Sequence, residues 1–175
     1  MAVLVEGLTV VMRCEAIVKK FTGGVDAFKA SLPNSTLCSD GEIACVNFMV
    51  PVDVQSYIEH LTENGLTYKD DGKSIDIVVV DQTRGPTTLC DWVDFGEANW
   101  NNDPKCPISL CCAKETKLNQ IVVPEGWNYE SSLSANHKYV EGESIPDNLK
   151  FLRNENGLDV LVDENTGQEF FVRRG

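Results

Sequence analysis

The chain has few basic residues, two histidines and only short apolar runs, and each shortage excludes a class of function. Its 15 Lys and Arg stand against 27 Asp and Glu in 175 residues, so the formal net charge is −12. Nucleic-acid binding needs a stripe of basic side chains that neutralises phosphates, and the sequence has none. Apolar runs such as residues 77–80 fall far short of the roughly 20 residues that a membrane helix needs. We therefore expect a protein that binds neither nucleic acid nor membrane.

The N-terminal segment carries no pattern typical of an export signal. No basic residues precede its apolar residues, and Glu6 and Arg13 interrupt them, so the segment predicts a strand. The seven cysteines form an odd set. Reduced thiols and a cytoplasmic location are therefore the expectation.

Composition and length are those of an ordinary globular protein. Apolar residues make up 42% of the chain and charged residues 24%, so a disordered chain is excluded. We expect one domain over 1–175. Within this single domain, we expect a compact unit over 1–82 and a β-rich extension over 83–175.

The first half has the element order of an α+β fold. The predicted order is strand, helix, strand, strand, helix, strand, at residues 8–13, 15–32, 36–38, 43–49, 52–64 and 66–81, where Gly23-Gly24 breaks the first helix and a turn at 70–73 interrupts the last element. The helix over 52–64 has the clearest apolar periodicity, and Asn64-Gly65 ends it. This βαββαβ order predicts a ferredoxin-like antiparallel sheet with helices on one face. Any other α+β fold with a hairpin between two helices shares the order.

The second half is less periodic and predicts β-hairpins with one short helix. We expect strands at 89–95, 108–113 and 118–123, a long loop over 96–107, a helix over 146–153 and a terminal hairpin of 158–163 with 169–173. The residues between the two terminal strands, Glu164 to Gly167, predict a turn and not a calcium loop, because the twelve-residue ligand alternation is lacking.

The cysteines and histidines indicate no metal site or cofactor. Cys90, Cys106, Cys111 and Cys112 lack the paired spacing of a zinc site, and the last two should point to opposite faces of a strand. We interpret the cysteines mainly as core residues. His60 and His137 are expected to be solvated surface residues, because no nucleophile motif accompanies either one. Glycine spacings for phosphate binding are lacking too.

Acidic and aromatic residues coincide in one stretch. Asp91, Asp94, Glu97 and Asp103 lie close in sequence to Trp92 and Trp100 on a strand end and its loop. Carboxylates beside aromatic rings can hold a cation or a basic chain, or do acid–base chemistry. A core role for Trp92 with solubilising acids around it is the plainer alternative. The candidate binding residues are Asp91, Trp92, Asp94, Glu97, Trp100, Asp103 and Trp127.

No motif assigns a family or a reaction, so two functional hypotheses stay open. The first is a non-enzymatic interaction protein whose negative surface engages a basic protein partner, in an inhibitor or immunity-like role. The second is a small-ligand-binding or enzymatic α+β domain with an aromatic-lined pocket. Exposed strand edges would also allow a homodimer.

Overall fold

The structure is a computed structural model that describes residues 1–114, 116, 120–130, 132–136, 138–140, 149–155, 158–163 and 169–173. It divides into two compact units, Met1–Gly126 and Trp127–Gly175. The single-domain organisation over 1–175 stays a prediction.

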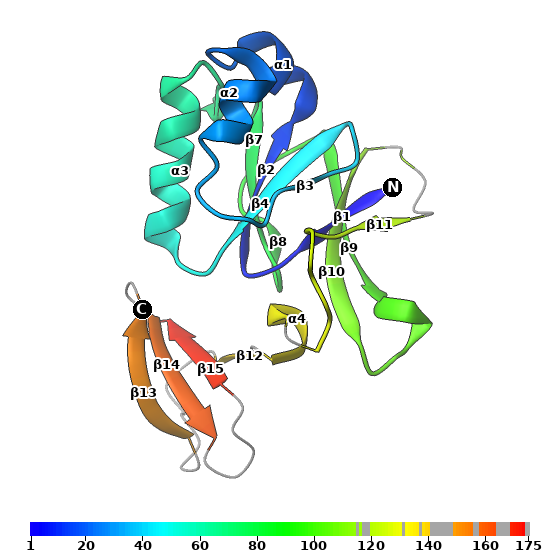
Figure 1. Cartoon of the computed structure of the whole chain (residues 1–175), viewed down its shortest axis with the longest axis vertical. Helices are drawn as coiled ribbons and strands as arrows, with labels where there is room; N and C mark the ends of the chain where they lie inside the picture. Colours follow the sequence, from blue (N-terminus) through cyan, green and yellow to red (C-terminus); the bar gives the residue numbers. More distant parts are fainter. Residues whose placement is uncertain are drawn as a thin grey trace. The chain divides into compact units, whose positions relative to one another are not determined.

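An antiparallel sheet of five strands forms the centre of the first unit (Figure 1). In spatial order its strands are β3 (Cys38–Ser39), β4 (Ile43–Phe48), β2 (Leu8–Arg13), β7 (Ile77–Asp81) and β8 (Gly85–Pro86). The predicted α+β class, an antiparallel sheet with helices, is confirmed. The ferredoxin-like assignment stays a prediction, because β8 and a second sheet add to the βαββαβ unit.

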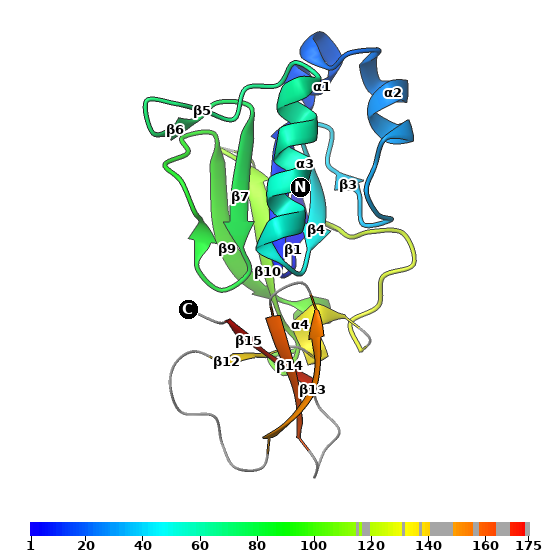
Figure 2. The same cartoon turned by 90° about the vertical axis from the view of Figure 1, so that its left-hand side faces the viewer.

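Three helices cover one face of this sheet: α1 (Cys14–Lys20), α2 (Gly24–Ala30) and α3 (Pro51–Glu63). Figure 2 shows α3 running along the strands. Val10 and Met12 of β2 point to this side, and Tyr57 and Leu61 of α3 pack against the same cluster. The helices predicted at 15–32 and 52–64 are therefore confirmed, with the break near Gly23 and the stop at Gly65 in place.

A second sheet covers the other face of the central sheet. In spatial order its strands are β11 (Ile121–Val122), β1 (Ala2–Val5), β10 (Pro107–Ala113) and β9 (Val93–Asn99). Val11 and Val78 of the central sheet meet Val3 and Cys111 of this one in a shared core. Successive residues of a strand point to opposite faces. Both faces of β2 are consequently buried, which explains its unbroken apolar run.

The chain passes from one sheet to the other at Glu6 and Gly7. Gly7 has φ 61°, and its N–H donates to Gln82 Oε1 at 2.8 Å. The N–H of Glu6 donates to Thr9 Oγ1 at 3.1 Å, and Thr9 Oγ1 lies 2.8 Å from Asn47 Oδ1. At the bend, side chains in place of a neighbouring strand accept the hydrogen bonds of the N–H groups of Glu6 and Gly7. Buried main-chain polar groups need such partners. The one strand predicted for the N-terminal segment is thus two strands in two sheets.

Several predicted boundaries in the first unit are wrong. The strand expected at 89–95 is β9, four residues later, and the long loop shrinks to a 3-10 helix, η1 (Trp100–Asn102), with the residues up to β10. The strand predicted at 118–123 is expected to pair with β10 as a hairpin. Its described part is β11, which pairs in parallel with β1 instead. The hairpin after α3 consists of two strands of two residues each, β5 (Lys69–Asp70) and β6 (Lys73–Ser74). These strands form a small sheet of their own, and β7 is not part of it.

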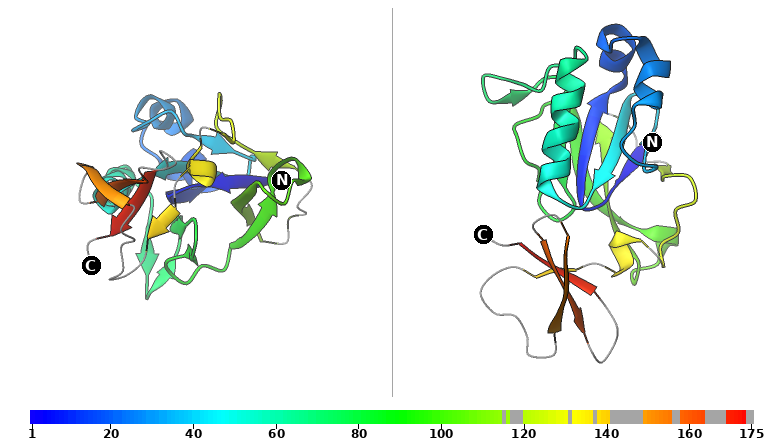
Figure 3. Two further views of the ribbon diagram at one scale, coloured as in Figure 1. Left: turned by 90° about the horizontal axis from the view of Figure 1, so that it is seen from below. Right: turned by 60° about the vertical axis from the view of Figure 1, so that its left-hand side comes forward.

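The second unit contains a helix, α4 (Leu133–Asn136), and a four-stranded sheet (Figure 3). In spatial order the strands are β12 (Lys138–Val140), β15 (Glu169–Arg173), β14 (Leu158–Asp163) and β13 (Leu149–Glu155). The terminal hairpin of β14 and β15 is confirmed. The helix expected at 146–153 is wrong over its described part, because Leu149 to Arg153 pair with β14 as a strand. The turn at 164–167 lies outside the described residues.

In the part of the chain that the structure describes, no helix is both long enough and apolar enough to cross a membrane.

The close approach after α3 gives a first prediction. Gly65 has φ +109°, and a Cβ there would lie 2.3 Å from the carbonyl oxygen of Lys20. We expect Gly65→Ala to lower the free energy of unfolding by about 3 kcal/mol, because the strained φ and the overlap with backbone act together. Gly72→Ala is the matched control, since Gly72 has φ +75° but open space around it and should cost about 1 kcal/mol. Equal losses in urea denaturation would contradict the steric explanation.

The core between the sheets gives a second prediction. Burial raises the pKa of Cys111 to about 12, above the value of about 8.5 in an unfolded chain. The stability from keeping this thiol neutral is complete below the unfolded pKa, and it is lost as pH rises through the folded pKa. The free energy of unfolding should therefore fall above about pH 9, and less steeply in Cys111→Ala. An identical slope in both proteins would show that other groups cause the loss.

Candidate functional site

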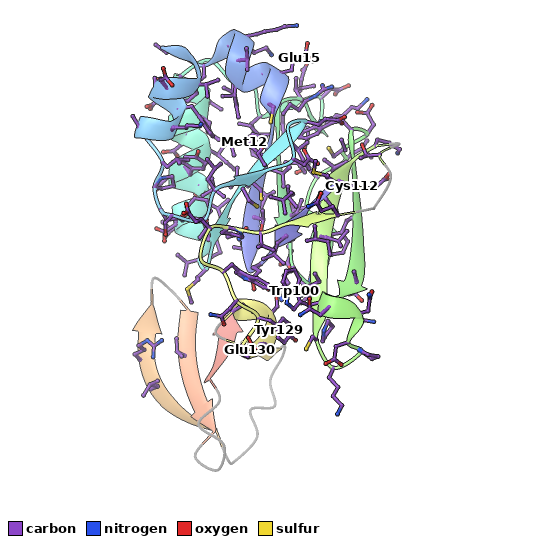
Figure 4. All side chains as sticks on the ribbon, turned by 45° about the vertical axis from the view of Figure 1, so that its right-hand side comes forward. Met12, Glu15, Trp100, Cys112, Tyr129 and Glu130 are labelled. Atoms are coloured by element: carbon purple, nitrogen blue, oxygen red, sulfur yellow. The ribbon has the colours of Figure 1, made fainter. Side chains whose placement is uncertain are left out.

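A groove of about 560 Å³ lies where β9 ends and η1 begins. Its apolar lining comes from the second sheet, and its polar lining from the end of β9, from η1 and from the residue before β11. The apolar residues are Ala98, Leu110 and Ile121. The polar residues are Glu97, Asn99, Asn101, Asn102 and Gln120, all exposed, with the half-buried ring of Trp100 among them. Figure 4 labels Trp100 at this end of the sheet.

A closed set of hydrogen bonds holds the loop that carries Trp100. Trp100 N–H donates to Cys106 O at 2.8 Å, Asp103 N–H to Trp100 O at 3.0 Å, and Cys106 N–H to Asp103 O at 2.9 Å. The Asp103 carboxylate accepts the N–H of Lys105 at 2.9 Å and lies 3.7 Å from the Cys106 thiol, which donates to it. Asp103 therefore stabilises the loop from within.

Asn101 and Asn102 take unusual backbone conformations beside the groove. Their φ angles are 53° and 57°, in the left-handed region. Asparagine tolerates this region better than most residues, and with the hydrogen bond from Asp103 N–H to Trp100 O the two residues form the type I′ turn that is typical of β-hairpins. The consequence is that η1 turns sharply and presents both amide side chains on the exposed surface at the groove.

The predicted site residues separate into groups. Glu97 and Trp100 both line the groove. Asp91 and Trp92 precede β9, and six residues of extended chain span about 20 Å, so they lie far from Glu97. Asp94 is exposed opposite Cys112, on the other face of β9 from Glu97.

Asp91 and Trp92 have partners within the first unit. The ammonium of Lys73 forms an ion pair with the Asp91 carboxylate and donates a hydrogen bond to it. This hydrogen bond lowers the pKa of Asp91. The indole N–H of Trp92 donates to Ser74 O at 3.1 Å, and the Arg13 guanidinium lies 5.4 Å from its ring centroid. The plainer interpretation, Trp92 as a packing residue, fits these contacts.

Trp127 belongs to the second unit. Its ring lies edge-on to Tyr129, with centroids 6.3 Å apart. Its role as a binding residue stays a prediction.

Sequence analysis missed a second polar groove, of about 450 Å³, between α3, the end of β4 and the segment that follows α2. Polar side chains and two aromatic rings line it: Ser31, Pro33, Asn34, Phe48, Asp53, Ser56, Tyr57 and His60. His60, expected to be solvated, is half-buried, with its ring stacked on Tyr57 and its Nε2 3.0 Å from Ser31 Oγ. A contact across 29 residues leaves no signal in the local sequence. His137 lies outside the described residues.

The hydrogen bonds around His60 decide what it can do. The Ser31 hydroxyl donates its single hydrogen to Phe28 O at 3.1 Å, so Nε2 of His60 is the donor to Ser31 Oγ. The amide nitrogen of Asn64 donates to His60 O at 2.8 Å and faces Nδ1 at 3.5 Å, in agreement with this tautomer. A general base would need a free lone pair on Nε2. In this arrangement His60 links α2 to α3 and does not activate Ser31.

No three described His, Cys, Asp or Glu side chains come together in a way that could hold a metal ion. Comparisons of the chain with protein-family models, with curated proteins and with solved structures gave no match. The function of this chain is therefore inferred from the chemistry of the groove beside Trp100.

The loop gives a prediction about Asp103. Asp103→Ala should remove the acceptor for Lys105 N–H, lower the free energy of unfolding by about 1 kcal/mol and speed hydrogen exchange at Trp100 and Cys106. Asp103→Asn keeps one oxygen acceptor and should stay close to the unsubstituted protein. If both variants exchange at the unsubstituted rate, the carboxylate does not hold the loop.

Proposed function

We propose that the protein is a non-enzymatic binding protein that takes a small, hydroxyl-rich ligand, with the chemistry of a sugar or polyol, in the groove beside Trp100. The observation that carries the proposal is the set of lining residues: Trp100, Glu97 and four residues with amide side chains, together with the apolar residues Ala98, Leu110 and Ile121. The volume of about 560 Å³ falls within the range of small-molecule sites.

Amides suit hydroxyl groups for a simple reason. A hydroxyl both donates and accepts a hydrogen bond, and an Asn or Gln side chain also does both. Four amides at Asn99, Asn101, Asn102 and Gln120 can therefore pair with several hydroxyls without a mismatch. The indole of Trp100 offers a broad apolar face for the C–H groups between those hydroxyls. Neither feature would favour a simple anion, because Glu97 would repel it.

The arrangement favours binding over hydrolysis. Cleavage of a glycosidic bond ordinarily uses two carboxyl groups about 5 to 9 Å apart. Among the described lining residues Glu97 is the one carboxylate, and Asp94 lies four residues, about 13 Å of extended strand, before Ala98. Glu97 would instead accept hydrogen bonds from ligand hydroxyls, which strengthens binding by charge assistance.

The hypothesis of a basic protein partner keeps the net charge of −12 as its support. Asp91 and Trp92 are two of the residues that this hypothesis assigns to the partner-binding surface. Within the protein, Asp91 already pairs with Lys73, and Trp92 already contacts Arg13. A basic partner would have to compete with these contacts. The hypothesis stays a prediction, and the ligand groove has the more specific structural support.

Calorimetric titration tests the proposal. We expect at least one soluble member of a panel of mono- and oligosaccharides and polyols to bind saturably, and Trp100→Ala to weaken that binding at least tenfold, since an aromatic anchor often contributes more than 1.4 kcal/mol. Gln120→Ala should weaken it less, because one amide is lost among several. Leu89→Ala, an exposed substitution outside the groove, should bind like the unsubstituted protein.

Two results would contradict the proposal. One is the failure of the whole panel to bind, and the other is binding that Trp100→Ala leaves unchanged. Titration with polylysine at low and high salt distinguishes the other hypothesis, because a charge-driven partner binds in a salt-sensitive way that Trp100→Ala should not alter.

A further inference from the structure

Two cysteines of the central sheet face each other at unusually short range. Cys38 of β3 and Cys45 of β4 are directly opposite in the antiparallel register, and their sulfur atoms are 3.1 Å apart. Cys38 is 6% exposed and Cys45 is fully buried. Both are free thiols, as expected from the sequence.

The backbone geometry at this pair suits a disulfide. Residues directly opposite in an antiparallel pair have Cα atoms about 4.5 to 5.5 Å apart, within the range of about 4.4 to 6.8 Å found for disulfides. To reach a bond length of about 2.05 Å, the sulfur atoms need to approach by about 1 Å. Small side-chain rotations can supply that movement without a change of register.

The position of the pair tells which thiol meets a reagent first. Cys38 belongs to a two-residue strand at the end of the strand order, and the turn that follows this strand contains the exposed residues Gly41 and Glu42. A short edge strand opens locally at low cost. Cys45 is enclosed, and its thiol donates to Leu4 O of β1 at 3.7 Å. The hydrogen bond with the Cys38 thiol and burial together hold the pKa of Cys45 well above its usual value. Cys38 is the accessible partner.

We propose that Cys38 and Cys45 form a reversible disulfide with a small-molecule disulfide as oxidant, which links β3 covalently to β4. The Cys38 thiolate attacks one sulfur of the oxidant, so a mixed disulfide forms and one small thiolate leaves. The Cys45 sulfur then attacks the Cys38 sulfur, and the second small thiolate leaves. Two protein thiols are oxidised, one small disulfide is reduced to two small thiols, and the two protons pass to the departing thiolates.

Neighbouring cysteines are worse placed for the same reaction. Cys111 is close enough for its charge to raise the pKa of Cys45, but it lies on β10 of the other sheet. Cys111 and Cys112 are adjacent in one strand and contribute to different clusters. Cys14 lies 3.3 Å from the Ser39 hydroxyl, so its sulfur faces an oxygen atom. This inference is independent of the ligand groove.

The experiment uses the full chain incubated with glutathione disulfide at pH 8, followed by alkylation and intact mass measurement. We expect the native protein to lose two of its seven alkylatable thiols and to yield one peptide cross-linked between Cys38 and Cys45. Reduction with a small dithiol should restore all seven. The oxidised protein should melt roughly 5 °C higher, because the link constrains the unfolded chain.

Two variants separate the roles of the sulfurs. Cys45→Ala should trap one glutathione on Cys38, since the resolving thiol is gone. Cys38→Ala should form neither the cross-link nor the adduct, and circular dichroism checks that both variants fold. Cys14→Ser is the matched control at the same edge and should oxidise like the unsubstituted protein. A cross-link between another pair of cysteines, or seven free thiols after prolonged incubation, would overturn the proposal.

Discussion

Burial of both faces of the central sheet is the constraint on which the first unit depends. Helices take one face and the second sheet takes the other, so β2, β4 and β7 have no solvated side. Every main-chain polar group at the edges of this core must then find a partner inside the protein. The bend at Glu6 and Gly7 meets this demand with Thr9, Asn47 and Gln82.

The same constraint accounts for the cysteines. A sulfur atom is small and apolar enough to fill the space between two β-sheets, and the buried residues Cys38, Cys45 and Cys111 lie in that space. Burial raises the pKa of Cys111, and the pairing of β3 with β4 sets Cys38 and Cys45 face to face. Core packing and potential redox chemistry thus arise from one arrangement of strands.

The candidate site lies at the end of β9 in the second sheet, where the pairing with β10 stops. Beyond the last pair of β9 and β10, η1 leaves the sheet, and its tight turn and internal hydrogen bonds hold the backbone at Trp100. A rigid sheet with a short, tightly bonded loop is a sound base for a binding groove, because the loop loses little freedom when a ligand binds. The other groove, around His60, uses its polar groups to join two helices.

Local pattern determined the parts of this protein whose signal lies in neighbouring residues. The α+β class, α3 with its stop at Gly65, β2, and the hairpin of β14 and β15 could all be predicted from the sequence. The charge balance and the concentration of acids with aromatics around 91–103 could be read from it too. Within that stretch, pattern could not tell Glu97 and Trp100, which line the groove, from Asp91 and Trp92, which have intramolecular partners.

Only the tertiary structure decided which distant residues meet. The ion pair of Lys73 with Asp91, the contact of His60 with Ser31 and the parallel pairing of β11 with β1 join segments whose sequences carry no mark of one another. The strand at 149–155 had residues compatible with a helix, and its pairing with β14 overrode that preference. Composition and periodicity set the elements, because they act over a few residues. The sites follow from packing, because packing acts across the whole chain.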